Sequence, residues 1–356
     1  MTAHTTAYST LPSPLQRVAI IMLSAAGDAV HALPVLNAIK RRDPDSYITW
    51  VMQPGPATLV RGHPAVDEIV LFDRARGWRA FLDVRRALAT PHEIVVDLQV
   101  YLKAGIITAM ANAPVKLGFD RARAYDLNWL FTNRQIAPHP MQHVQDQYLE
   151  FLAALGIGKD PVTWGLGPWD SERAAQKEFL AKFDRPIVPL VIGSSKPQKD
   201  WLPDRWAAVA DALSADFGLR PVLVGGRSPR ELETERAILA QAREPVFSAL
   251  GSGLRPLVGI LDGAPLVVSL DTGPLHMAVA LDRPVISLIG YGNPKRIGPY
   301  RKFHDLMIDA YGDPGEDYPV STKNRSGRMP RITVKDVLDR AEIWKSRYAR
   351  SKGRKS

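Results

Sequence analysis

The sequence predicts an α/β protein with two domains, each built on a parallel sheet, and three observations carry this prediction. Its 356 residues are enough for two domains of typical size. Short runs rich in Val, Ile and Leu alternate with longer amphipathic runs, as in a parallel sheet covered by helices on both faces. The alternation breaks once, at "LGIGKDPVTWGLGPWDSER". We therefore predict domains over 1–165 and 166–330, then a closing helix and basic tail over 331–356.

The expected strands and helices follow one another in pairs through both halves. In the first half, predicted strands are "RVAIIML", "SYITWVMQ", "EIVLF" and "EIVVDL", and the amphipathic runs "PATLVRGHP", "GWRAFLDVRRALAT" and "LKAGIITAMANA" follow the last three of them. In the second half, the strands "PIVPLVIG", "RPVLVGG", "PVFSAL", "PLVVSLD" and "PVISLIG" alternate with helical runs such as "PDRWAAVADALSADFG" and "GPLHMAVALD". Gly, Pro and Asp make "YGDPGEDYPVSTKNRSGRMP" a predicted loop, and "TVKDVLDRAEIWKSRYAR" is the predicted closing helix.

Composition and charge limit the classes of function. A formal charge of +9 and a pI near 9.7 favour anionic partners, which include nucleic acids, phosphorylated metabolites and acidic membranes. No basic stripe interleaved with aromatic residues points to nucleic acid, so we expect no nucleic-acid partner. The absence of cysteine excludes disulfides, thiolate metal sites and cysteine nucleophiles. No apolar run approaches the roughly 18 residues of a membrane span and no secretory signal is recognisable, so we expect a cytoplasmic protein.

The candidate binding and catalytic residues lie where predicted strands lead into predicted helices. In open parallel sheets ligands bind beyond the carboxyl ends of the strands, where the first N–H groups of helices attract anions. At the first such junction, "SAAGDAVH", small residues permit close approach of a ligand, and Asp28 falls in the first helical turn. Asp28 is either a helix cap or an active-site base, and spacing alone favours the cap. His31 lies on the same helical face and is either a substrate contact or a packed histidine.

A second junction, "GSSKPQKDW", combines hydroxyl and ammonium groups. Gly193 ends a buried strand, Ser194 and Ser195 follow it, and Lys196 and Lys199 come next. These groups suit a phosphate, and a solvated polar loop is an equally good interpretation. The spacing excludes a Walker A loop.

A third junction, "SLDTGPLH", has Asp271 at a strand end and His276 in the first helical turn. Thr272 and Gly273 are in position to offer N–H groups, and Thr272 a hydroxyl, to a pyrophosphate, while Pro274 suits the first helical position. An ordinary capped helix is the alternative.

Two further junctions add charge at the same predicted edge. The junction "GGRSPRE" introduces acidic residues at the start of a helix, and the loop "YGNPKRIGPY" adds Lys295 and Arg296 beyond the next strand. Taken together, the junctions predict a face lined with groups that accept an anion.

At this point the sequence resembles glycosyltransferase family 9, the ADP-heptose:lipopolysaccharide heptosyltransferases. The resemblance rests on "LSAAGDAVHALPVLNAIKRRDPDSYITWV", "HPAVDEIVLFD", "VDLQVYLKAG", "GSSKPQKDW" and "DTGPLHMAVALDRPVISLIGYGNPKRIGPY", which occur in family order from about residue 18 to about residue 300. It implies a GT-B architecture, in which two Rossmann-like domains with parallel sheets face each other across a cleft. It also implies an inverting transferase that needs no metal and no cofactor besides its ADP-sugar donor.

The resemblance also implies roles for individual residues. Asp28 of "S-x-x-G-D" corresponds to the general base, and Lys199 before "D-W" to the phosphate contact. A glutamate is expected at the ribose, and an insertion around Pro229 leaves Glu231 or Glu233 for this role, with Glu231 preferred. The donor-binding set is thus Ser194, Ser195, Lys199, Glu231, Asp271, Thr272, Gly273 and His276.

An acceptor of this family carries sugar carboxylates and lipid phosphates, so cationic side chains in the N-terminal domain are expected to bind it. The candidates are Arg61, Lys103, Arg121 and Arg123. For each of them a solvated surface charge is the alternative. The implied partners are a nucleotide-sugar donor, an anionic lipopolysaccharide-precursor acceptor and the inner membrane, touched peripherally at its cytoplasmic face.

Rival functions remain open at this level. Another family 9 transferase with a different sugar or acceptor fits nearly as well, and a GT-B nucleotide-sugar epimerase would show isomerised donor without transfer. A non-catalytic binding protein would tolerate the loss of Asp28. A dinucleotide-dependent dehydrogenase is disfavoured, because no G-x-G-x-x-G follows an early strand.

Overall fold

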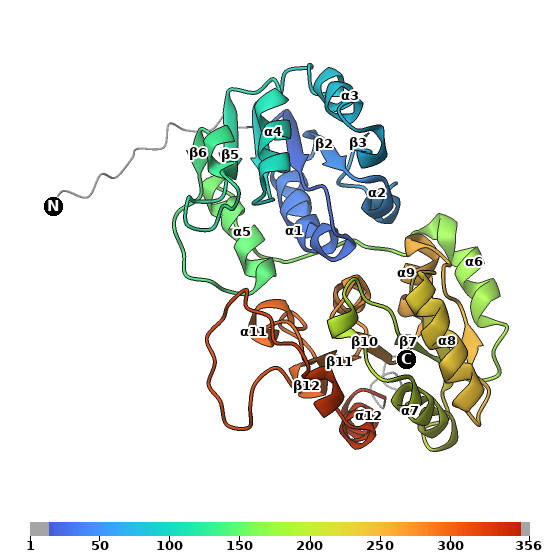
Figure 1. Cartoon of the computed structure of the whole chain (residues 1–356). Helices are drawn as coiled ribbons and strands as arrows, with labels where there is room; N and C mark the ends of the chain where they lie inside the picture. The colour runs from blue at the N-terminus through green and yellow to red at the C-terminus, as the bar shows by residue number, and fades with distance from the viewer. Residues whose placement is uncertain (1–13, 350–356) are drawn as a thin grey trace. The chain divides into compact units, whose positions relative to one another are not determined.

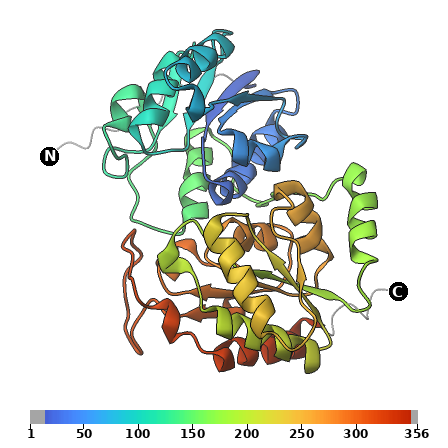
Figure 2. The same cartoon turned by 45° about the vertical axis from the view of Figure 1, so that its right-hand side comes forward.

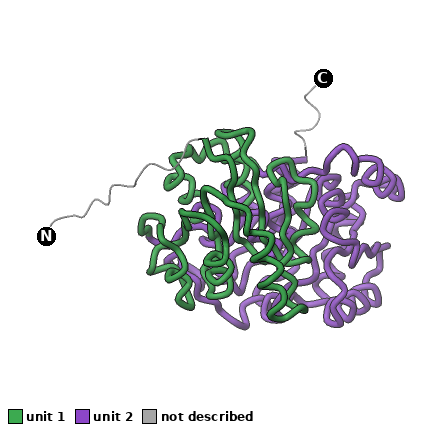
Figure 3. The backbone as a smooth tube through the Cα atoms, turned by 90° about the horizontal axis from the view of Figure 1, so that it is seen from above, with its two compact units in different colours: residues 1–24, 32–139, 147–163 green, residues 25–31, 140–146, 164–356 purple. Residues whose placement is uncertain are grey.

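The computed structural model describes residues 14–349 (Figure 1). Within this range the chain divides into two compact units (Figure 3). Unit 1 comprises residues 14–24, 32–139 and 147–163, and unit 2 comprises residues 25–31, 140–146 and 164–349. Unit 2 therefore includes the first turn of the first helix and also the closing helix, which the sequence prediction treats as a separate segment.

Unit 1 is built on a parallel sheet with the strand order β3-β2-β1-β4-β5-β6. Its central strand β1 pairs with β2, with Ala19 opposite Thr49, and with β4, with Val18 opposite Ile94. The central strands are buried on both sides, which explains their nearly continuous apolar sequences. The strands are β1 (Arg17–Ile21), β2 (Tyr47–Met52), β3 (Glu68–Leu71), β4 (Ile94–Asp97), β5 (Val115–Gly118) and β6 (Arg134–Gln135).

Helices cover this sheet because each connection between parallel strands must cross over. Ala80 and Val84 of α3 and its C-cap residue Leu88 recur every four residues, and they join a core with Ala104 and Ile107 of α4. The helices are α1 (Ala26–Arg42), α2 (Pro54–Val60), α3 (Arg79–Ala87), α4 (Leu102–Met110) and α5 (Val144–Ala154), with 3-10 turns η1 (Arg74–Arg76) and η2 (Asn128–Phe131).

Unit 2 repeats the architecture with the order β12-β11-β10-β7-β8-β9, again all parallel. Numbered within its own unit, each sheet follows the order 3-2-1-4-5-6 of a doubly wound Rossmann-like fold. The strands are β7 (Ile187–Val191), β8 (Arg220–Val224), β9 (Phe247–Ser248), β10 (Val267–Leu270), β11 (Val285–Ile289) and β12 (Met307–Asp309).

The helices of unit 2 form two groups, in which α7 packs against α8 and α12, whereas α9 packs against α6 and α10 (Figure 2). Right-handed crossovers that run in opposite directions from β7 place α7 and α10 on opposite faces of the sheet. The helices are α6 (Asp170–Leu180), α7 (Pro203–Ala215), α8 (Pro229–Gln241), α9 (Leu254–Gly263), α10 (Gly273–Ala280), α11 (Pro294–Ile297) and α12 (Val334–Arg347), and the 3-10 turns are η3 (Pro197–Lys199), η4 (His304–Leu306) and η5 (Met329–Arg331).

The predicted fold class is confirmed: two parallel six-stranded sheets with α/β connectivity, one in each unit. The edge strands of the two sheets are β3, β6, β9 and β12, and the sequence pattern predicted β3 and β9 among them. Across residues 14–349 no helix combines the length and apolar character that a membrane crossing requires. The start of the chain, judged to lack a signal, and the end of the basic tail fall outside the described residues.

Candidate active site

The predicted donor residues lie in segments that follow strands at one edge of the unit 2 sheet. Ser194, Ser195 and Lys199 follow β7, Glu231 follows β8, and the group that begins with Asp271 follows β10. Because all these strands are parallel, their carboxyl ends share an edge, and the side chains that the sequence spreads over some 80 positions converge there.

An ion pair forms the charged centre of this edge. The Nζ atom of Lys199 lies 2.6 Å from Oδ2 of Asp271 and donates a hydrogen bond of 3.1 Å to the Asp271 carbonyl oxygen. The Asp271 side chain is 9% exposed and that of Lys199 is 18% exposed. The Lys199 ammonium has three N–H donors and its contacts with Asp271 occupy two of them, so one donor is left for an anionic ligand.

The start of α10 supplies polar groups beside this pair. Thr272 is the N-cap residue, but its side chain makes no capping bond, and its hydroxyl is buried with no hydrogen-bond partner among the described residues. A buried hydroxyl without a protein partner is costly, and it is available to hydrogen-bond a ligand. The predicted role of Thr272 and Gly273 in anion binding thus has a geometric basis.

The first turn of α1, which belongs to unit 2, lies against the first turn of α10. Gly27 is tightly enclosed: a Cβ atom at this position would lie 3.1 Å from Cδ2 of His276 and 3.4 Å from Cα of Gly273. Two helix N-termini, each with a positive macrodipole end, therefore meet at one point. Asp28 lies in this turn, and its Oδ2 atom accepts a 2.9 Å hydrogen bond from the backbone N–H of Ala25. The capping role that the sequence allowed for Asp28 is thus present.

Three histidines lie close together near these turns, and no sequence pattern predicts their grouping. The ring of His31 lies 4.3 Å from that of His276 and 5.9 Å from that of His143, centroid to centroid. Gln145 ties them together, because its amide bonds to Nδ1 of His31 and its backbone N–H donates to Nδ1 of His143. Nε2 of His143 donates to the carbonyl oxygen of Gly298.

These histidines are uncharged near neutral pH. Burial lowers the pKa of His31 to about 4, and burial together with the neighbouring His31 lowers the pKa of His143 to about 4. Burial, followed by the nearby His31, His143 and Lys199, lowers the pKa of His276 well below its usual range. His276 is therefore a neutral packing and hydrogen-bonding group beside the ion pair.

The two serines differ in their surroundings. The Ser194 Oγ atom lies 2.7 Å from the carbonyl oxygen of Lys196 and 2.5 Å from Oδ1 of Asp200, two acceptors for its single proton, while Ser195 is exposed. Arg230 closes the same turn, since it pairs with Asp200 at 2.5 Å and donates to the Ser194 carbonyl. Ser194 thus helps to shape the loop, and Ser195 and Lys196 face solvent.

Glu231 is the better placed of the two glutamate candidates, because it stands directly over the end of β7. It accepts hydrogen bonds from the N–H of Gly226 and from both N–H and Oγ of Ser228, completing a capping box on α8. Burial opposes its ionisation, but these hydrogen bonds hold its pKa below the usual range. A Cβ at Gly193 would fall 1.9 Å from Oε1 of Glu231, so a side chain at position 193 would force Glu231 to move. Glu233 is exposed on α8.

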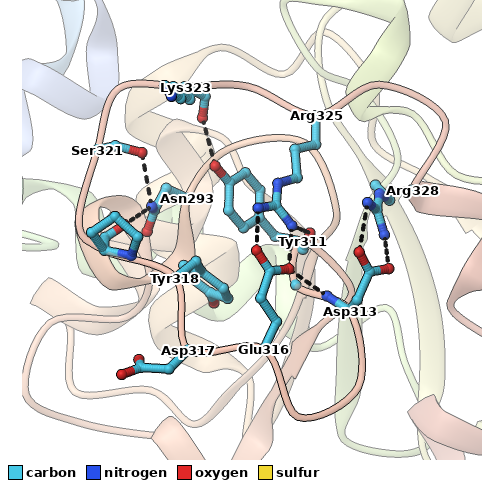
Figure 4. Close-up of polar contacts among 12 residues, drawn as sticks. Asn293, Tyr311, Asp313, Glu316, Asp317, Tyr318, Ser321, Lys323, Arg325 and Arg328 are labelled. Atoms are coloured by element: carbon cyan, nitrogen blue, oxygen red, sulfur yellow. Dashed lines mark hydrogen bonds and ion pairs between the residues drawn. The ribbon is translucent and has the colours of Figure 1, made fainter.

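The loop after β11 is braced by the segment 311–328, which the sequence predicted as an irregular loop. Arg325 pairs with Glu316 (Figure 4). The two side chains are 2.6 Å apart, and the Arg325 guanidinium lies 4.5 Å from the centre of the Tyr311 ring. Asn293 donates to the carbonyl oxygen of Pro319. Lys295, expected at the anion face, instead pairs with Asp317 at 2.7 Å and bonds to the Tyr318 carbonyl.

The segment 311–328 also affects the surroundings of the Lys199–Asp271 ion pair, through Gly292. Gly292 belongs to the loop that the segment holds, and a Cβ there would lie 3.0 Å from Oδ2 of Asp271. The segment 311–328 therefore fixes the backbone that borders Asp271.

The four predicted acceptor cations lie in unit 1, and their environments differ. Arg61, Lys103 and Arg121 are exposed. Arg123 is 8% exposed, and it is held by the carboxylates of Asp120 and Glu150. Because two carboxylates neutralise Arg123, this residue has a structural role that the sequence did not reveal. Its contact with an acceptor stays a prediction.

Comparison with known proteins gives this arrangement a context. The family described as Glycosyltransferase family 9 (heptosyltransferase) matches residues 81–312. The lipopolysaccharide core heptosyltransferase OpsX of Haemophilus influenzae is 29% identical, over 90% of this chain and 94% of its own. Lipopolysaccharide heptosyltransferase 1 of Salmonella typhimurium is 30% identical, over 80% of this chain and 92% of its own.

Solved structures agree with these matches. The E. coli heptosyltransferase WaaC with ADP is 25% identical with a TM-score of 0.73, and the match covers 92% of this chain and all of that one. A glycosyl transferase family 9 structure from Veillonella parvula shares the fold, with a TM-score of 0.79, 22% identity and coverage of 92% and 97%.

Proposed function

This chain belongs to glycosyltransferase family 9, the heptosyltransferase family, and we propose that it transfers heptose from ADP-heptose to the inner core of a lipopolysaccharide precursor. The observation that carries the proposal is the meeting of two helix N-termini beside the Lys199–Asp271 pair, because this group matches the charge of a nucleoside diphosphate. The names of the similar proteins, including one solved with ADP, support the same donor.

The donor is proposed to bind at the strand ends of unit 2. The diphosphate lies against the start of α10, where Thr272 and Gly273 offer N–H groups and Thr272 its unpartnered hydroxyl, and Lys199 binds a phosphate oxygen. Glu231 accepts hydrogen bonds from the ribose hydroxyls, and for this it gives up part of its own hydrogen bonding, such as the bond from the Ser228 hydroxyl. Ser194, Ser195, Asp271 and His276 complete the donor contacts.

The proposed reaction is a single displacement with inversion, independent of metal. An acceptor hydroxyl oxygen forms a bond to the anomeric carbon while the bond from that carbon to the diphosphate oxygen breaks, and the hydroxyl proton passes to the Asp28 carboxylate. Lys199 and the α10 N-terminus stabilise the charge that grows on the departing ADP. Asp28 keeps its bond to Ala25 through one oxygen, and capping and base catalysis are compatible because a helix start favours the carboxylate.

The acceptor side of the proposal involves unit 1. Arg61, Lys103 and Arg121 are exposed cations suited to sugar carboxylates and lipid phosphates, and Arg123 is assigned to the same surface as a more deeply set member. We propose that the enzyme works in the cytoplasm and touches the inner membrane peripherally, since its acceptor is lipid-linked.

A transfer assay tests the proposal directly. The protein is incubated with ADP-heptose and a panel of truncated lipopolysaccharide acceptors, with and without EDTA, and products are read by mass spectrometry. Addition of one heptose to an inner-core acceptor, unaffected by EDTA and with inverted anomeric configuration, is expected. Transfer of another sugar would identify a different family 9 enzyme. Isomerised donor without transfer would indicate an epimerase, and donor binding without either reaction a binding protein.

A further inference from the structure

Exposed hydrophobic side chains are concentrated in one part of the chain. Among residues 14–349, ten large hydrophobic side chains are exposed, and only Leu239 and Phe247 belong to unit 2. The other eight, all in unit 1, are Leu71, Trp78, Leu82, Tyr101, Leu102, Tyr125, Leu127 and Leu130. Single exposed hydrophobic residues are ordinary on a protein surface, but a concentrated set is not.

Leu71 is the last residue of β3, and the other seven follow the carboxyl ends of β3, β4 and β5. The strands β4 and β5 are neighbours in the sheet, whereas β2 and β1 lie between them and β3. Residues 78–82 follow β3, residues 101–102 follow β4 and residues 125–130 follow β5. The strands are parallel, so these segments leave the sheet at one edge. The adjoining helices α3 and α4 pack against each other, as do α4 and η2. We call these eight side chains the edge patch.

The centre of the edge patch is fixed by specific contacts. The rings of Tyr101 and Tyr125 are stacked with centroids 6.2 Å apart, and the N–H of Tyr125 donates to the carbonyl oxygen of Val100 at 2.7 Å. The side chain of Asn128, which is fully buried, donates to the Tyr101 carbonyl. Leu127 adopts the left-handed conformation, with φ of 60°, which a leucine disfavours, and its side chain is 58% exposed. The fold thus holds apolar groups outward at some conformational cost.

Cations accompany the apolar groups on the same segments. Arg74, Arg79, Arg85, Lys103 and Arg121 are all exposed. Among the described residues, Asp83 forms ion pairs with Arg76 and Arg86, and none of the five cations forms one. Exposed Trp, Tyr and Leu with a surplus of Arg and Lys is the composition that binds the interface of a negatively charged membrane.

We propose that the edge patch docks the protein on an anionic lipid bilayer, with Trp78, Tyr101 and Tyr125 at the headgroup level and Leu127 and Leu130 in the apolar boundary. Charge complementarity favours this occupant over a second copy, because the same basic surface on two chains would repel itself. The inference depends on the proposed function in one respect: the lipid-linked acceptor is the reason why this protein meets a membrane. It assigns the contact to named side chains.

Vesicle sedimentation with the full chain tests the inference. Vesicles of phosphatidylcholine alone and of phosphatidylcholine with phosphatidylglycerol are used, and neither contains acceptor or donor. Wild type is expected to sediment with the anionic vesicles and to be released by salt. The double variant Leu127→Ser and Leu130→Ser should lower the partition coefficient about tenfold, because two leucines no longer enter the boundary. The matched control, Leu239→Ser in unit 2, should bind as wild type does.

Further readings separate the alternatives. Circular dichroism and thermal melting establish that the double variant is folded, and its transfer to a water-soluble, deacylated acceptor should equal that of wild type, which tests the proposed function apart from docking. Failure of wild type to bind anionic vesicles, or equal binding by the double variant, would overturn the inference. Binding only when acceptor is embedded in the vesicle, or self-association that the double variant abolishes without vesicle binding, would assign the patch to another occupant and overturn it as well.

Discussion

Two aspartates stand at corresponding places in the two sheets and have different surroundings. Asp97 is the last residue of β4, and Asp271 directly follows β10. Each of these strands is the fourth along the chain in its own sheet, and each pairs with the first. Asp97 is fully buried and accepts hydrogen bonds from the side chains of Asn128 and Thr108 and from the N–H of Gln99, all of them neutral donors. Asp271 instead pairs with the ammonium of Lys199.

The difference shows what turns a strand-end carboxylate into part of a binding site. Burial raises the pKa of Asp97 to about 7 even though three hydrogen bonds oppose the rise, since no cation accompanies it. In unit 2 the loop after β7 brings Lys199 to the end of β10, beside two helix N-termini. The loop after the neighbouring strand therefore determines the surroundings of the strand-end carboxylate. In unit 2 this loop places a cation beside Asp271, whereas in unit 1 neutral side chains enclose Asp97.

The largest predicted contrast comes from the same substitution in the two regions. Asp28→Asn should lower transfer by about 100 to 10,000 fold, because an amide still accepts the bond from Ala25 but takes no proton. Asp97→Asn should leave turnover within a few fold of wild type. Steady-state rates of both variants on one acceptor make the comparison, with ADP affinity as the control for folding. Turnover near wild type in Asp28→Asn would leave that residue as a cap alone.

Substitution of Lys199 tests the role of the cation that accompanies Asp271 and is missing beside Asp97. Lys199→Ala should slow transfer by about 10 to 1,000 fold and weaken ADP binding, because it removes a charge-assisted contact to the departing diphosphate. Lys196→Ala is the matched control in the same loop, since Lys196 is exposed and lies over the Tyr291 ring at 5.4 Å. Equal losses in both variants would mean that the site responds to general basic charge.

The closed surroundings of Asp97 predict an unusual pH dependence of stability. Folding raises its pKa from 3.8 to about 7, so the folded state keeps a proton that the unfolded chain releases, and this group's contribution to the free energy of unfolding falls as pH rises from about 4 to about 7. The difference between wild type and Asp97→Asn should change over this window by up to a few kcal/mol, at about 1.4 kcal/mol per pKa unit. Urea unfolding at several pH values measures it.

The buried histidines impose the opposite slope, which is why the difference between variants is needed. The pKa values of His31 and His143 are lowered to about 4, so the unfolded chain binds their protons first as pH falls below 6.5, and stability is lost toward pH 4. Both contributions are shared by wild type and Asp97→Asn and cancel. A difference that stays flat between pH 4 and 7 would show that Asp97 is ionised in the folded protein.

The smallest predicted effect concerns the exposed cations of unit 1. Neutralising Arg61 and Arg121 together should raise the Michaelis constant for acceptor about fivefold and leave that for ADP-heptose unchanged, and added salt should narrow the gap. Arg123→Ala should instead destabilise the protein by about 3 kcal/mol, because it strands Asp120 and Glu150 without their partner. A change confined to the donor constant would remove Arg61 and Arg121 from the acceptor surface.

Sequence patterns predicted the parts of this protein that local chemistry determines. The apolar runs before Asp28, Gly193 and Asp271 are strands, and the small or capping residues after them begin helices or turns, because strand burial and helix starts leave local signatures. The order of the strands and the convergence of the junctions then follow from the handedness of parallel crossovers.

Contacts between distant segments could not be predicted in this way. The grouping of His31 with His143, the enclosure of Asp97 by Asn128 and the neutralisation of Arg123 each join residues that no periodic pattern relates. Two glycines at the junctions lie where another segment approaches closely: Gly193 at Glu231 and Gly27 at His276.

Calorimetric titration with ADP tests the central claim, that a cation brought by the neighbouring junction makes the Asp271 strand end a diphosphate site, whereas Asp97 ends a closed structural pocket. Wild type, Lys199→Ala and Asp97→Asn are compared at one pH. Asp97→Asn is expected to bind ADP as wild type does, and Lys199→Ala is expected to bind it at least tenfold more weakly. Wild-type affinity in Lys199→Ala, or a loss of ADP binding in Asp97→Asn with the fold intact, would contradict it.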